Sequence, residues 1–139
     1  MSDQTPPSNG NVPLTLGQWL ALVTIGAVLW LLVIFLLRAV GALGGYSAMG
    51  TVLFYLLLVP GTVPLVVATR KIVGLRANQV LAAVAIVTAS ASLLDGVALA
   101  AMPSFYGNNP LGASTALLWG VGVALFLGVL MNRAAPDRR

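Results

Sequence analysis

One acidic residue, Asp95, interrupts an apolar stretch that reads ASLLDGVALAAMP over residues 91–103. A carboxylate in such surroundings must be neutral, hydrated or paired, because an isolated charge is costly to bury. Thr88 and Ser92 precede it by seven and three residues, so a helix would place them on nearly the same face as a small polar seam. Arg38, followed by the apolar AVGAL, is a candidate partner, with both charges about 7–10 Å inside the same boundary.

Three interpretations of Asp95 follow. It could form an intramembrane ion pair with Arg38, with a carboxylate oxygen within about 4 Å of the guanidinium. It could serve as a transport or proton-relay site, or it could be a neutral, hydrogen-bonded acid. The segment holds a single acid and the chain has no His to pass a proton, which weakens the relay. We therefore take the ion pair as the working hypothesis.

The composition of the chain indicates a membrane protein. Of its 139 residues, 59% are hydrophobic and 7% are charged, whereas soluble domains carry about 25% charged residues. The sequence contains no Cys and no His, which argues against disulfides, thiolate or imidazole metal ligands and Ser-His-Asp catalysis. Since no nucleophile–base pair or phosphate loop is evident either, we expect no enzyme, no metal and no cofactor.

Four apolar segments are each long enough to cross a bilayer as a helix, which takes about 20 residues. They cover residues 17–43, 48–69, 78–102 and 111–131. The connectors are short, so consecutive helices should run antiparallel. We therefore predict an all-α membrane protein, an up-down-up-down four-helix transmembrane bundle over residues 16–132. A flexible polar tail (1–15) and a basic tail (133–139) should flank it.

Two features of these segments could shape a site. Pro60 and Pro64 in VPGTVP each remove a backbone donor, so the second helix should kink or break, as helices do at some transporter sites. In the fourth segment, small residues recur every four positions and should form a smooth ridge for close helix packing. The ridge consists of Gly112, Ala116, Gly120, Ala124 and Gly128. It could pack against the third helix, or it could serve a homodimer or partner.

Aromatic residues mark the ends of the segments. Trp19 lies near one boundary, and Tyr46 and Tyr106 lie near the other, as interfacial anchors do. Trp30 and Trp119 fall nearer mid-span, so we expect them to be packing residues.

The basic residues predict orientation and compartment. Six of the seven lie on the side shared by both tails and the middle connector, namely Arg70, Lys71, Arg76, Arg133, Arg138 and Arg139. By the positive-inside rule, both termini should face the cytoplasm. The net charge of +4 then reflects the lipid bilayer and topology and not nucleic acid. A composition rich in Arg, Ala and Gly suggests a bacterial inner-membrane protein.

Three stretches resemble a domain-of-unknown-function family of short, four-helix bacterial membrane proteins. They are the end of the first segment around Arg38, LLDGVALAAMPSFYG at 93–107, and LGASTALLWGVGVAL at 111–125. Gly96 departs from the bulkier or β-branched residue that often follows the acid in that family. The resemblance implies the four-helix fold and no particular activity.

Two functions are consistent with these features. We expect a non-enzymatic protein that acts through helix packing, as an accessory or scaffold subunit bound to a membrane-protein partner or to a second copy. The alternative is a small dimeric transporter or exporter built around Asp95 and the Pro60/Pro64 break. A water-accessible cavity that reaches Asp95 would favour the transporter, whereas a sealed apolar surround would exclude it.

Overall fold

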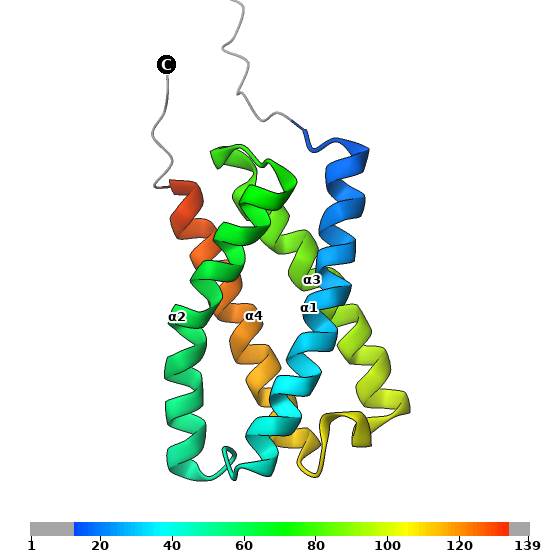
Figure 1. Cartoon of the computed structure of the whole chain (residues 1–139), viewed down its shortest axis with the longest axis vertical. Helices are drawn as coiled ribbons and strands as arrows, with labels where there is room; N and C mark the ends of the chain where they lie inside the picture. Colours follow the sequence, from blue (N-terminus) through cyan, green and yellow to red (C-terminus); the bar gives the residue numbers. More distant parts are fainter. Residues whose placement is uncertain (1–12, 134–139) are drawn as a thin grey trace, which may run out of the picture.

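The computed structural model describes residues 13–133, which form four long helices joined by short connectors (Figure 1). The long helices are α1 (Leu16–Ala42), α2 (Ala48–Val73), α3 (Val80–Ala101) and α4 (Pro110–Arg133). Two short 3₁₀ turns, η1 (Ala77–Gln79) and η2 (Pro103–Tyr106), precede α3 and α4. No strand occurs between residues 13 and 133, so the prediction of a helical chain is confirmed for this range.

All four helices are long and apolar enough to cross a membrane. Their bounds lie close to the predicted segments, except that α2 continues past residue 69 to Val73. Arg70 and Lys71 lie in its last turn, where cations interact favourably with the helix dipole, so these charges do not end the helix. Gly74 ends it in the left-handed conformation, with φ of 65°. The predicted tails, 1–15 and 133–139, fall almost entirely outside the described residues.

Side-chain caps fix where the helices begin. Thr15 and Gln18 form a capping box, in which each side-chain oxygen accepts a hydrogen bond from the other residue's backbone N–H, at 3.2 and 3.0 Å. Before α4, Oδ1 of Asn109 accepts the Gly112 N–H at 2.8 Å, and Pro110 occupies the first helical position. The start of α4 is therefore fixed close behind η2.

The four long helices differ in which neighbours they pack against and over what length. α3 packs against both α1 and α4, and α4 packs against α2, whereas α1 and α2 contact each other over a shorter stretch. In Figure 1, α1 and α3 run in the same direction along the molecule. Gly26 of α1 lies against α3, since a Cβ there would come within 2.8 Å of the Val87 carbonyl oxygen and also collide with Ser90. This contact sets the register of α1 on α3.

The largest group of buried residues lies where η2 folds back between the helices. It draws on α1, α3, η2 and α4, and comprises Ile34, Leu37, Ala98, Tyr106, Ala113 and Ala116. Tyr106 is 1% exposed and is therefore a core residue of the chain. The prediction that Tyr106 is an interfacial anchor is wrong, because the turn after α3 carries its side chain inward.

α2 is one continuous helix through both of its prolines, so the predicted break at Pro60 and Pro64 is absent. The axis of α2 changes direction along its length in Figure 1, which leaves the milder expectation of a bend. Both prolines are exposed. Each proline lacks only one backbone donor, and the remaining hydrogen bonds of α2 keep the helix continuous.

The small-residue ridge of α4 faces the interior of the bundle. Ala116 and Gly128 are buried, and the other three members are half-buried. A Cβ at Gly128 would lie 3.3 Å from Val84 of α3, and one at Gly112 would lie 2.9 Å from the Tyr46 ring. At these two positions the ridge packs within this chain, and the contact of Gly128 with Val84 is the packing against the third helix that the first interpretation expected.

Candidate functional site

Asp95 lies in α3 and is 9% exposed. The Tyr106 hydroxyl donates a hydrogen bond to its Oδ1 at 2.5 Å. The indole N–H of Trp30 in turn donates to the Tyr106 hydroxyl oxygen at 3.2 Å. One residue from each of α1, α3 and η2 thus forms a continuous hydrogen-bond chain that ends on the carboxyl group.

The turn after α3 brings Tyr106 back to this acid. Pro103 cannot continue the α3 hydrogen-bonding pattern, and the chain closes into η2, with the Phe105 N–H on the Met102 carbonyl at 2.9 Å. Gly107 follows with φ of 90°, a conformation that favours glycine.

Burial, together with the hydrogen bond to Asp95, raises the pKa of the Tyr106 hydroxyl above its ordinary 10.0. Tyr106 is therefore a protonated donor at neutral pH.

The predicted ion pair between Arg38 and Asp95 is wrong. Arg38 is exposed, and its Nη1 donates to the Phe105 carbonyl oxygen at 3.4 Å, whereas Asp95 is bonded to Tyr106.

The helix register explains this outcome. Gly26 of α1 lies level with Val87 and Ser90 of α3. At 1.5 Å per residue, Arg38 lies about 18 Å beyond Gly26, whereas Asp95 lies only about 8–12 Å beyond Ser90 and Val87. The two charges therefore differ in depth by one or two helical turns.

The structure separates the two residues of the predicted polar seam, Thr88 and Ser92. Thr88 is half-buried and lines the same cavity as Asp95, while its hydroxyl donates to the Val84 carbonyl oxygen at 2.7 Å. Ser92 is exposed and lies outside that cavity. It is about 60° around the helix from Asp95, which is enough to turn it to the outer face.

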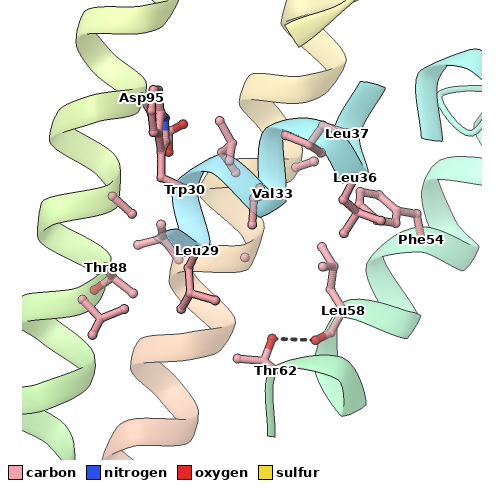
Figure 2. Close-up of a pocket in the computed structure, with 16 residues that line it drawn as sticks. Leu29, Trp30, Val33, Leu36, Leu37, Phe54, Leu58, Thr62, Thr88 and Asp95 are labelled. Carbon is pink, nitrogen blue, oxygen red and sulfur yellow. Dashed lines mark hydrogen bonds between the residues drawn. The ribbon is translucent and has the colours of Figure 1, made fainter. Parts of the chain in front are cut away.

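A central cavity of about 150 Å³ lies between the four helices (Figure 2). Its polar side chains are Trp30, Thr62, Thr88 and Asp95, and its other side chains are apolar. The central cavity is partly open and not enclosed on all sides, and Leu36 in its wall is 46% exposed. Asp95 is therefore not sealed inside the bundle.

Two further cavities flank the central one. A second cavity of about 100 Å³ shares Thr62 and Thr88 with the central cavity and extends to Arg70, in the last turn of α2. An outer cavity of about 420 Å³ is lined by Arg38, Tyr106 and the connector before α4. Tyr106 therefore separates the outer cavity from Asp95.

Within residues 13–133, no group of three or more acidic, His or Cys side chains could hold a metal ion.

Sequence reasoning missed Tyr106 as the partner of Asp95 and gave Trp30 only a packing role. The usable signal was Pro103 directly after the helix and Gly107 four residues later, which together predict a tight reversal of the chain. A reversal of that length can return Tyr106, which directly precedes Gly107, to the level of Asp95 in the preceding helix.

Comparisons with protein-family models, with curated proteins and with solved structures give no match for this chain. The resemblance to a domain-of-unknown-function family therefore stays a prediction.

Proposed function

We propose that this chain is a multi-pass protein of the bacterial inner membrane, with an antiparallel four-helix transmembrane bundle and both termini in the cytoplasm. The length and apolar character of the four helices support insertion. The basic residues support the orientation. Arg70 and Lys71 lie in the last turn of α2, Arg76 lies in the connector that follows, and Arg133 ends α4, whereas Arg38 lies near the C-terminal end of α1, at the other end of the bundle.

Its proposed role is that of a non-enzymatic accessory subunit, which binds a helix of another membrane protein or of a second copy on the outer face of α3. One observation carries this proposal. Ser92, Gly96 and Ala100 are exposed, and the space beside Gly96 is open. Small residues let membrane helices approach closely, and α4 already uses its own small residues inside the chain. The face of α3 is therefore the one suited to a helix from outside.

Co-purification from the source membrane in mild detergent tests this role. Gly96→Leu should greatly reduce the amount of any partner that co-purifies with the full chain, because the side chain would hold the two helices apart. Gly122→Leu on α4 is the matched control, since Gly122 is also exposed with open space beside it. A wild-type chain that purifies only as a free monomer would count against the accessory role.

A small transporter is the second candidate, and the cavity that reaches Asp95 favours it. This version of the transporter depends on Asp95 and not on Pro60 or Pro64, which are exposed and do not line the central cavity. Uptake of small amines into proteoliposomes should then require Asp95. Equal uptake by the wild type and by Asp95→Asn would reject this candidate.

A further inference from the structure

The polar groups around the central cavity have already used their donor protons. The Thr62 hydroxyl donates to the Leu58 carbonyl oxygen at 2.6 Å, as Figure 2 shows, and the Thr88 hydroxyl donates within α3. The Trp30 N–H donates to Tyr106. What the wall still offers is therefore acceptor capacity: the lone pairs of two hydroxyl oxygens and those of the Asp95 carboxylate.

The remaining capacity of Asp95 is considerable. A carboxylate has two oxygens with about four acceptor positions, and Tyr106 uses one of them on Oδ1. Among residues 13–133, Asp95 is also the one ionisable side chain that lines this cavity, and no Lys or Arg of this range lines it to balance a negative charge. A cationic donor would satisfy both its hydrogen bonding and its charge.

The size and the remaining wall restrict the ligand further. About 150 Å³ is the volume of a cavity that holds one benzene-sized molecule. Apart from the four polar residues, the wall is built from Leu, Val, Ala, Phe and Gly side chains, and Trp30 adds an aromatic ring that can face a cation. The cavity is partly open, and the helices that form its wall are apolar enough to cross a membrane, which suits a molecule that partitions into a bilayer.

We propose that the central cavity binds a small, mainly apolar primary amine, with its ammonium group on Asp95 and its hydrocarbon part among the apolar side chains. The proposal rests on the cavity of the transport candidate and names its ligand class. A free amine fits better than a lipid headgroup, whose phosphate would bring a second negative charge close to Asp95.

The test is isothermal titration calorimetry on the full chain in phosphatidylglycerol nanodiscs, which contain no lipid amine, with empty nanodiscs subtracted. Benzylamine, toluene and benzoate are the probes, since they share a ring and differ in charge. Benzylamine should bind at least tenfold more tightly than toluene, and benzoate should not bind. Adding phosphatidylethanolamine to the nanodiscs should leave the benzylamine affinity unchanged; competition by this lipid would identify a headgroup as the ligand and reject the free amine.

Two variants connect this binding to the site. Asp95→Asn keeps the shape of the side chain and removes its charge, so benzylamine affinity should fall about ten- to hundredfold. Gly120→Leu should abolish binding, because Gly120 lines the cavity and a Cβ there meets no atom within 4 Å. Gly122→Leu, two residues along α4 on an exposed face, should bind like the wild type.

Equal affinities for benzylamine and toluene would overturn the proposal, as would wild-type benzylamine affinity in Gly120→Leu or in Asp95→Asn. The Gly120 variant keeps Asp95, so it gives an answer even where the Asn variant is unstable. Asp95-dependent benzylamine binding without any uptake into proteoliposomes would support this proposal and reject the transport candidate alone.

Discussion

The Tyr106 hydroxyl and the Asp95 carboxyl group share a buried hydrogen bond, and this bond fastens η2 onto the C-terminal third of α3. Trp30 extends the bond to α1 by donating to the same hydroxyl. One phenol group thus links three elements of the chain. It also stands between the outer cavity and the cavity that contains Asp95.

Removing this hydroxyl should destabilise the fold. Tyr106→Phe keeps the ring but deprives both Asp95 and Trp30 of a buried partner, so we expect a loss of about 1–3 kcal/mol in the free energy of unfolding. Denaturation of the detergent-solubilised chain measures it. Tyr46→Phe is the control, because its hydroxyl donates only to the Leu37 carbonyl at 3.1 Å and is less buried. Equal losses in the two variants would contradict the special role of Tyr106.

The same hydroxyl predicts an alkaline pH dependence. Its pKa in the folded chain is raised above 10.0 by burial and by Asp95, so the folded state favours the neutral phenol. That contribution is complete below about pH 10 and is lost as the pH rises through the raised folded value. The stability difference between the wild type and Tyr106→Phe should therefore stay constant from neutral pH to about pH 10 and narrow above it. Burial also raises the pKa of Tyr46, but Tyr46 is present in both proteins and cancels. A difference that stays constant across the alkaline range would argue against this linkage.

Arg38 should matter little for stability. It is exposed and makes a 3.4 Å hydrogen bond to the Phe105 carbonyl, so we expect Arg38→Gln to cost less than about 1 kcal/mol. A buried ion pair with Asp95 would instead cost about 3–5 kcal/mol when broken. The loss in an Arg38→Gln/Asp95→Asn double variant should equal the sum of the two single losses. A double variant that loses clearly less than this sum would restore the ion-pair hypothesis.

The four helices followed from the sequence because apolar runs of this length have few alternatives to a helix. Their ends were less predictable. Arg70 and Lys71 suggested a connector by their charge alone, but the carbonyls of the last helical turn accommodate them. Proline at positions 60 and 64 suggested a break, but the rest of the α2 hydrogen bonds keep it continuous.

The site was harder to predict than the helices, because it depends on the register between them. Counting residues from the predicted ends placed Arg38 and Asp95 at similar depths. The actual register is set by one close contact, that of Gly26 with Val87 and Ser90, which composition does not reveal. Asp95 itself stands out in the sequence as one acid in an apolar span, and the structure places it in the wall of the central cavity.

This register makes Gly26 the most sensitive glycine of α1. A methyl group there would lie within 2.8 Å of the Val87 carbonyl oxygen and would overlap Ser90, so α1 must move away from α3 to accept it. We expect Gly26→Ala to cost about 1–3 kcal/mol, although alanine favours the helix itself. Gly122→Ala is the control, since its methyl group meets nothing within 4 Å and should be neutral or slightly stabilising.

Because Trp30 follows Gly26 by about one turn, the displacement of α1 in Gly26→Ala should also lengthen the Trp30–Tyr106 hydrogen bond and weaken benzylamine binding. Unfolding and calorimetry on both variants measure the two effects together. A Gly26→Ala chain as stable as Gly122→Ala would show that this contact does not set the position of α1.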